Sequence, residues 1–341
     1  MSLWMKSLAF SSNFSKTLIF SNEYKILFHT SRLFSFFVKP PKKEDEPQIR
    51  NHLRKQVIKM HQLDAENVAN GLYPPTLFGP VDIKNHLLRF PSVLLDSLKV
   101  ARRRKLNTNH DIPEDDESVP DYLKRNYHFQ TDGYFSEESA SLYEHQVEIL
   151  FSGTASPMRR YLIKMIKDHL KKDPTKPLKI LEIGAGVGSA TLDFSQSFEL
   201  ESYTVLDVSK DYLAVAKKRL NHSKLNFVVA PAENLPFKEE EFDLVFSVFL
   251  FHELPRSIRQ KVLAESYRVL KKSGLLAIAD SIQLDDEPVI NSVLENFPRD
   301  YHEPFYKDYI QWNVKDSLQK EGLQTLACEH LLLSKYWVAQ K

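Results

Sequence analysis

The 341-residue sequence contains a single cysteine, Cys328, which excludes an intramolecular disulfide and any zinc site built from several cysteines. It also lacks an apolar run of the roughly 18 residues that a membrane-spanning helix needs. Its formal net charge is only +1, so no overall field attracts the chain to nucleic acid or to an anionic membrane. These absences indicate a globular protein that is stabilised by burial of apolar side chains.

Glycine is scarce as well, with nine residues in the whole chain, and three of them fall within Gly184–Gly188. Because the composition is poor in glycine, this clustering indicates a tight turn or the close approach of a ligand. The apolar run Leu178–Ile183 predicts a strand before the glycines, and a helix is expected to begin near Ser189. A strand that feeds a helix through glycines forms a pocket at the carboxyl edge of a parallel sheet.

Strands and helices alternate from Leu178 onward, which is typical of a parallel sheet with crossover helices. The last two apolar runs lack a long crossover, and we expect an antiparallel hairpin there. The predicted fold is a seven-stranded, mostly parallel, Rossmann-like doubly wound α/β sheet over residues 171–341. The further strands are expected at Tyr203–Leu206, Leu225–Val229, Phe242–Phe249, Leu275–Ala279, Leu323–Leu331 and Tyr336–Ala339, and helices at Asp211–Leu220, Ser257–Leu270 and Lys307–Glu321.

Residues 1–39 hold five basic residues against one acid, Glu23, with serines interleaved among Phe and Leu. This composition predicts an organelle transit peptide, with Arg32–Ser35 as a mitochondrial processing site. A plastid address has the same composition, and an ordinary disordered N-terminus is a third interpretation. The proline- and lysine-rich residues that follow predict a solvated linker.

Residues 40–120 are expected to form a charged helical extension, broken at Tyr73–Pro75 and Gly79–Pro80. The basic run Arg102–Lys105 is followed by the acidic run Glu114–Glu117, without the aromatic residues of a nucleic-acid interface, which favours a solvated helix end. Residues 121–170 are expected to form a helical lid over the carboxyl edge of the sheet, with one helix over Ser136–Phe151 and another after residue 157.

Asp207 ends the second predicted strand, where a carboxylate can accept both hydroxyls of a ribose. A nicotinamide dehydrogenase is the first alternative. Its fingerprint G-x-G-x-x-G/A, however, has glycine or alanine at the position where this chain has Ser189. Glu182 would also repel a pyrophosphate at the helix N-terminus. S-adenosylmethionine (SAM) carries a sulfonium and an ammonium instead, so the charges favour SAM as the cofactor.

The run Leu181–Gly188 resembles motif I of class I SAM-dependent methyltransferases, and Leu206–Ser209 looks like the acidic end of their second strand. Ala232–Phe237 is similar to a motif of the UbiE-like branch, which includes the quinone-ring methyltransferases of ubiquinone and menaquinone synthesis. Phe242–Val245 and Arg268–Gly274 complete the pattern.

Two further regions, Tyr127–Arg160 and His302–Tyr309, resemble UbiE-like proteins of cyanobacteria and photosynthetic eukaryotes. The chain departs from the family at Pro231, where an aspartate is usual, so the adenine must be recognised by other groups. With this resemblance, the candidate cofactor-binding residues are Glu182, Gly184, Ala185, Gly186, Gly188, Asp207, Val208, Ala232, Glu233 and Ser247.

Deprotonation of a phenol, enol or acidic C–H acceptor needs a base that titrates near neutral pH, and His252 follows the fourth predicted strand at the pocket edge. The alternative is a structural histidine that caps a helix or bonds a loop. His252 and His302 each precede a glutamate as in a zinc-protease motif, but neither has the second histidine, so the spacing predicts no metal site. The candidate substrate-pocket residues, with packing as the alternative for each, are His128, Tyr134, His302 and Tyr306.

The sequence therefore predicts a SAM-dependent methyltransferase that acts on a small aromatic or quinone-like molecule in an organelle, the mitochondrion before the plastid. Two other functions stay open. One is methylation of protein or RNA in the organelle, in which Arg102–Lys105 would act; the other is an assembly factor that keeps the fold without catalysis.

Overall fold

Seven strands form one mixed sheet in the order β3-β2-β1-β4-β5-β7-β6. The first five pair in parallel, and β7 runs antiparallel to both β5 and β6. The predicted fold class is confirmed, including the final hairpin. In the computed structural model the strands are β1 (Leu178–Ile183), β2 (Leu200–Asp207), β3 (Leu225–Val229), β4 (Phe242–Val248), β5 (Leu270–Ser281), β6 (Gln324–Leu331) and β7 (Ser334–Gln340). The structure describes residues 2–34, 46–75, 83–106, 119–129, 132–170, 176–220 and 222–341.

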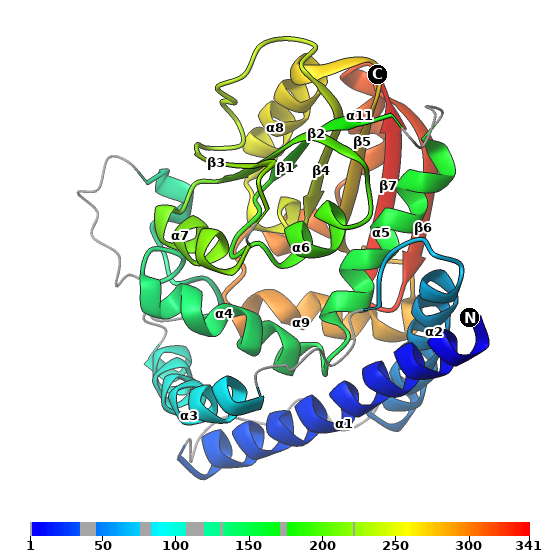
Figure 1. The fold of residues 1–341 in the computed structure, drawn as a ribbon. Coiled ribbons are helices and arrows are strands. Elements are labelled where there is room, and N and C mark those ends of the chain that lie inside the picture. Colours follow the sequence, from blue (N-terminus) through cyan, green and yellow to red (C-terminus); the bar gives the residue numbers. More distant parts are fainter. Residues whose placement is uncertain are drawn as a thin grey trace.

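Helices cover both faces of the sheet (Figure 1). On one face, Phe194 stacks on Phe246 with ring centroids 4.0 Å apart. On the other face, Leu181 of β1 belongs to a second apolar cluster that includes Leu263. The helices after β1 are α6 (Ser189–Ser195), α7 (Lys210–Arg219), η4 (Phe251–Glu253), α8 (Arg256–Val269), η5 (Pro288–Ile290), α9 (Asn291–Tyr301), α10 (Tyr306–Tyr309) and α11 (Val314–Lys320).

The strand order reverses between β1 and β4, because the chain continues from β1 to β2 on one side and returns to β4 on the other. A crevice opens at such a switch point, beyond the carboxyl ends of the strands.

The prediction of a single helix over Lys307–Glu321 was wrong, because the structure has two short helices there, α10 and α11. The Asn313 side chain accepts a 3.1 Å hydrogen bond from the Asp316 N–H and so starts a new helix. Two further differences are α9, which the sequence pattern did not indicate, and the earlier start of β5 at Leu270, which pairs with Phe242.

The N-terminal helices lie beyond the carboxyl edge of the sheet (Figure 1). The elements are α1 (Ser2–Phe34), α2 (Glu46–Ala69), α3 (Ile83–Leu106), η2 (Asp121–Leu123), η3 (Tyr127–Phe129), α4 (Glu137–Leu150) and α5 (Ala155–His169). The cavity described below is lined by Tyr24 of α1, Leu53 of α2 and Tyr143 of α4, and the role of residues 121–170 as a lid stays a prediction. No helix within the described ranges is both long and apolar enough to cross a membrane.

Helix α1, which lies within the predicted transit peptide, packs on α2 through buried polar contacts. Asn13 is 1% exposed and donates a 2.7 Å hydrogen bond to Asp64, which also forms a fully buried ion pair with Arg160 of α5. At the turn before α5, a Cβ on Gly153 would lie 2.9 Å from the backbone of Lys16. In this fold α1 is therefore part of the packed structure, and the organelle address stays a prediction. The predicted linker and the run Glu114–Glu117 lie outside the described residues, apart from the start of α2.

Candidate active site

A cavity of about 400 Å³ lies at the switch point, and both the glycine-rich loop and the lid line it. This volume is within the usual range of roughly 300–1,000 Å³ for small-molecule sites. Its walls include Gly184 and Asp207 on one side and His128, His252 and Tyr306 on the other. The predicted cofactor end and the predicted acceptor end therefore share one continuous space.

The three glycines of the loop have positive φ angles of 68°, 56° and 75°, a conformation that side chains disfavour. A Cβ on Gly184 would lie 2.9 Å from Leu250, and one on Gly188 only 2.6 Å from Leu220. A Cβ on Gly186 would meet nothing closer than 3.9 Å. Gly184, Ala185 and Gly186 line the cavity, whereas Gly188 lies outside its lining and lets α6 pack against the end of α7.

Asp207 at the end of β2 is anchored by the backbone beside the loop. Its carboxylate accepts hydrogen bonds from the Gly186 N–H at 2.7 Å and the Ser209 N–H at 2.8 Å. Burial raises the pKa of Asp207 to about 6, although these hydrogen bonds favour the charged form. The carboxylate and the neighbouring Val208 both line the cavity, in the position from which a carboxylate holds ribose hydroxyls.

Glu182 is 2% exposed, and its Oε2 accepts hydrogen bonds of 2.6 Å from both Thr191 and Tyr203. Burial raises the pKa of Glu182 to about 7. Among the described lining residues, Arg159 is the one arginine or lysine, and it pairs with Glu144 at 2.8 Å. The described lining thus offers several carboxylates but no group of arginine or lysine side chains that could bind a pyrophosphate. These charges, together with the open space at Gly186, fit SAM and disfavour a dinucleotide.

Residues of η2 line the edge that is predicted to receive adenine. Tyr122 and Leu123 of η2 line it together with Ala232. The Tyr122 hydroxyl donates to both carboxylate oxygens of Glu233, at 2.9 and 3.0 Å. Sequence reasoning missed Tyr122 and Leu123, because they precede the methyltransferase motifs and belong to no pattern. Ser247, in contrast, is fully buried within β4 and lies outside the cavity lining.

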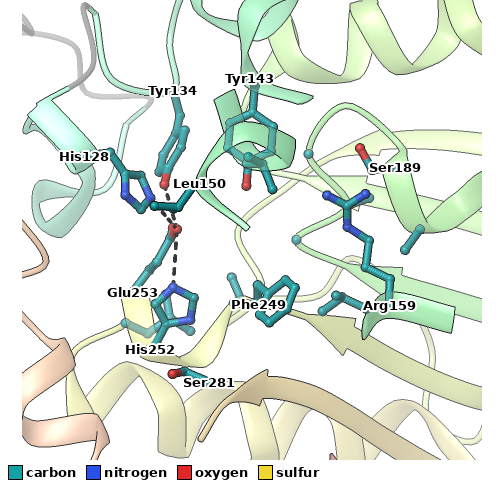
Figure 2. Close-up of a pocket in the computed structure, with 18 of the residues that line it drawn as sticks. His128, Tyr134, Tyr143, Leu150, Arg159, Ser189, Phe249, His252, Glu253 and Ser281 are labelled. Carbon is teal, nitrogen blue, oxygen red and sulfur yellow. Dashed lines mark hydrogen bonds and ion pairs between the residues drawn. The ribbon is translucent and has the colours of Figure 1, made fainter. Parts of the chain in front are cut away.

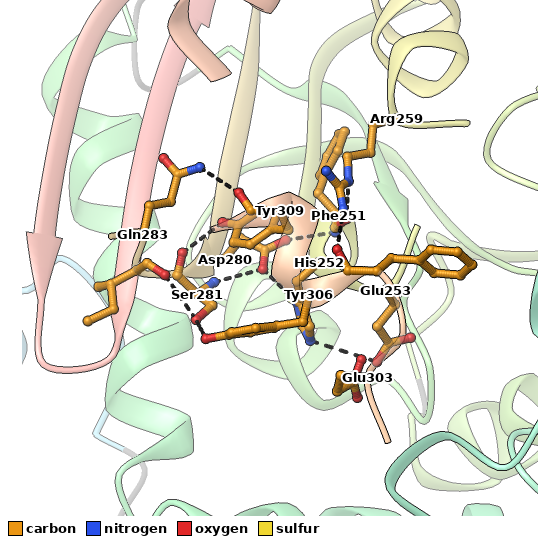
Figure 3. A network of polar contacts seen from close by, with 12 residues as sticks. Phe251, His252, Glu253, Arg259, Asp280, Ser281, Gln283, Glu303, Tyr306 and Tyr309 are labelled. Carbon is orange, nitrogen blue, oxygen red and sulfur yellow. Dashed lines mark hydrogen bonds and ion pairs between the residues drawn. The ribbon is translucent and has the colours of Figure 1, made fainter. Parts of the chain in front are cut away.

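His252 lies in η4, directly after β4, and its Nδ1 is 2.6 Å from Oδ1 of Asp280 (Figure 3). Burial alone would lower the pKa of His252, but the Asp280 carboxylate outweighs it and raises that pKa to about 9. Asp280 is itself fixed by the N–H groups of Phe251 and Ser281, each at 2.7 Å. Sequence reasoning missed Asp280, although its position at the end of the fifth strand places it on the same sheet edge.

Figure 2 shows His128 and Tyr134 from the lid directed at Glu253, the residue after His252. The Tyr134 hydroxyl donates to Oε1 of Glu253 at 2.6 Å, and Nε2 of His128 lies 3.8 Å from the same oxygen. Tyr306 completes this end: its hydroxyl is 2.6 Å from Oγ of Ser281, and its ring packs against His252 with centroids 5.9 Å apart. The structure thus brings His128, Tyr134 and Tyr306 together with His252.

The fourth predicted substrate residue, His302, follows α9 with a φ of 53° and does not line the cavity. Its neighbour Glu303, which is also outside the lining, contacts the lining residue His128. Glu303 is fully buried, and its Oε1 lies 3.1 Å from Nε2 of His128. Burial raises the pKa of Glu303 to about 7. The sequence pattern could not show that Glu303, and not the adjacent His302, contacts His128, because this depends on how the chain turns after α9.

Comparison with known proteins gives a family match that covers the core of the sheet. Residues 181–278 match the family described as "Methyltransferase domain". A fatty-acid O-methyltransferase of Mycolicibacterium smegmatis is 29% identical over 141 residues, which are 41% of this chain and 51% of that protein. The ubiquinone/menaquinone biosynthesis C-methyltransferase UbiE of Agrobacterium fabrum is 35% identical over 130 residues, 37% of this chain and 48% of that protein. The chain thus spans about half the length of these relatives.

Among solved structures, a SAM-dependent methyltransferase from Aquifex aeolicus aligns with a TM-score of 0.42 at 20% identity, over 55% of this chain and 93% of that one. Residues 181–278 of this chain carry a class I methyltransferase domain, and its cofactor is S-adenosylmethionine.

Proposed function

We propose that the protein transfers a methyl group from SAM to a small, largely apolar molecule that bears an ionisable oxygen or an acidic carbon, such as an aromatic or quinone-like compound. The observation that carries this proposal is that one cavity is lined both by the glycine-rich loop and by the group of His128, Tyr134, His252 and Tyr306. A cofactor and an acceptor bound in one space are held for direct transfer, which requires close and aligned reactants.

The acceptor half of the cavity is mostly apolar. Phe151, which follows α4, stacks on Phe249 beside β4 with ring centroids 5.9 Å apart. Leu150 of α4 also lines the cavity, as do Leu294 and Phe297 of α9. Such a surface favours a ring or an isoprenoid chain over a peptide or a nucleotide, because the polar groups of those polymers would lose their hydrogen bonds with water.

The residues at the polar end position the acceptor and favour its ionised form. Asp280 holds Nδ1 of His252, Nε2 lies 4.0 Å from Oε1 of Glu253, and the raised pKa of about 9 keeps the ring protonated at neutral pH. The cavity-lining His252 would thus place a positive charge and an N–H donor beside the reacting oxygen or carbon of the acceptor. The backbone at Gly184 and Gly186 would hold the methionine end of SAM, and Asp207 its ribose. SAM supplies an activated methyl group, so alignment and exclusion of water are the main contributions of the protein.

The relatives support a lipid-like acceptor, since one is named for fatty acids and the other for quinone synthesis. A place in the UbiE-like branch would agree with the motif Ala232–Phe237. The basic, serine-rich residues 1–39 support an organelle location, the mitochondrion first and the plastid as the alternative. The stretch Arg102–Lys105 lies in the last turns of α3, and neither Arg102 nor Arg103 is among the residues that line the cavity. The described lining therefore does not favour RNA as the acceptor.

The test is incubation of the full-length protein with methyl-labelled SAM and an organelle extract, followed by separation into lipid, protein and RNA fractions. We expect label in the lipid fraction, and much less of it with Asp207→Ala at limiting SAM, because this variant removes the carboxylate placed at the ribose. Label in protein or RNA that disappears with the same variant would contradict the proposed acceptor class. An absence of label in all three would contradict methyl transfer to these acceptors.

A further inference from the structure

We propose that His128, Glu253 and Glu303 bind a divalent metal ion, of the Zn²⁺ or Mn²⁺ type, at the acceptor end of the cavity. The three residues come from η3, from η4 and from the loop after α9, so no local spacing in the sequence brings them together. This explains why the sequence pattern predicted no metal site.

The geometry suits a single ion. One potential ligand atom from each residue lies within 4.8 Å of the others, and this is the one such group of three among the described residues. Nε2 of His128 is 3.1 Å from Glu303 and 3.8 Å from Glu253. Ligands around one ion at bond lengths of roughly 2.0–2.2 Å are separated by about 3–4 Å, so only small side-chain shifts are needed. Imidazole and carboxylate together favour zinc or manganese over calcium.

The environment of the Glu303 carboxylate is a second, independent observation that points to a bound cation. Its side chain is completely buried, yet neither carboxylate oxygen accepts a hydrogen bond from any described residue. A buried carboxylate normally has several such partners or coordinates a metal. The ion pair of Oε1 with His128 leaves Oε2 without a partner, and Figure 3 shows the Glu303 carboxylate beside that of Glu253.

The surroundings support the ligands without competing for them. Tyr134 donates to Glu253, as outer residues of metal sites orient the ligating carboxylates. His252 is the further positive group beside the ligands: its Nε2 lies 4.0 Å from Oε1 of Glu253, and Asp280 holds its Nδ1 at 2.6 Å. Among the described residues Glu303 forms an ion pair with His128, while Glu253 lies near both His128 and His252. A divalent cation between the two carboxylates would bind both at once.

Three protein ligands leave coordination positions open toward the cavity, as catalytic metal sites do. On the proposed function, those positions would take one or two oxygens of the acceptor. The acceptor class would then be molecules with adjacent hydroxyl or carbonyl oxygens.

The test is a titration of the full-length protein, stripped of metal by a chelator, with Co²⁺ as a visible-absorbance probe and Zn²⁺ as the competitor. We expect one Co²⁺ per chain, displaced by Zn²⁺, and binding weakened at least about tenfold in Glu303→Gln and in His128→Gln. The matched control is Glu287→Gln, which removes a carboxylate lying 3.2 Å from His52 and 3.3 Å from His330 at another place and should leave binding unchanged.

Circular dichroism and thermal melting test whether each variant is folded. If Glu303→Gln or His128→Gln is not folded, Glu253→Gln is used in its place. Absence of Co²⁺ and Zn²⁺ binding by the unsubstituted protein would overturn the proposal. So would binding that survives in folded Glu303→Gln and His128→Gln, or that is lost in the control. Calorimetry with S-adenosylhomocysteine on the same samples separates the two proposals, because intact cofactor binding without metal binding would refute the metal site alone.

Discussion

Replacement of Gly188 by alanine is expected to destabilise the fold, whereas the same change at Gly186 is expected to impair cofactor binding. At Gly188 the φ of 75° costs alanine about 1–2 kcal/mol. Its Cβ would lie 2.6 Å from Leu220 and 3.1 Å from Ala216, both buried, which adds about 1–3 kcal/mol of overpacking. The sum of about 2–5 kcal/mol corresponds to a fall in Tm of roughly 3–7 °C for a chain of this length.

At Gly186 only the backbone term applies, because the new methyl group meets nothing within 3.9 Å. That empty space belongs to the cavity, so the methyl group would displace the cofactor instead of destabilising the core. The assays are thermal melting without ligand and calorimetric titration with S-adenosylhomocysteine. A Gly188→Ala protein with unchanged Tm, or a Gly186→Ala protein with unchanged cofactor affinity, would refute this division of roles.

Three further predictions concern the cofactor and the lid. SAM binds the deprotonated form of Asp207, so its affinity should be complete above the raised pKa of about 6 and fall by up to about tenfold per pH unit below it; a flat calorimetric profile from pH 5 to 7 would contradict this. Tyr122→Phe removes the hydrogen bonds to Glu233 and should weaken S-adenosylhomocysteine binding about two- to tenfold, again by calorimetry. Asp64→Asn leaves the guanidinium of Arg160 buried without its charge partner and should cost about 3–5 kcal/mol in urea unfolding, and a loss below 1 kcal/mol would contradict the assigned burial.

The sheet could be predicted because its signals are local. Leu178–Ile183 is a short apolar run before glycines, and both its strand and the helix after it follow from neighbouring residues. The strand Leu225–Val229 was placed at its observed bounds for the same reason. The predicted helix over Lys307–Glu321 failed because its periodicity continues across Asn313, and only the capping hydrogen bond reveals the break.

The site was predictable where a residue ends a parallel strand. Asp207 and His252 follow β2 and β4, so the fold itself carries them to the cavity. Tyr122 lines the cavity from η2, and Glu303 meets the lining residue His128 from the loop after α9. Such tertiary contacts leave no spacing in the sequence. For Gly188 the motif was misleading. It places this glycine in the cofactor loop, but a Cβ at this position would meet Leu220 and Ala216, so the glycine is needed for helix packing.

The most direct measurement of the central claim is a calorimetric titration of the purified full-length protein with SAM and S-adenosylhomocysteine. We expect one site per chain for each ligand, and a loss of about 1–3 kcal/mol of binding free energy in Asp207→Ala, whose carboxylate lines the cavity beside Gly186. Absence of binding by both ligands, in a protein shown to be folded, would contradict the assignment of this cavity to the cofactor.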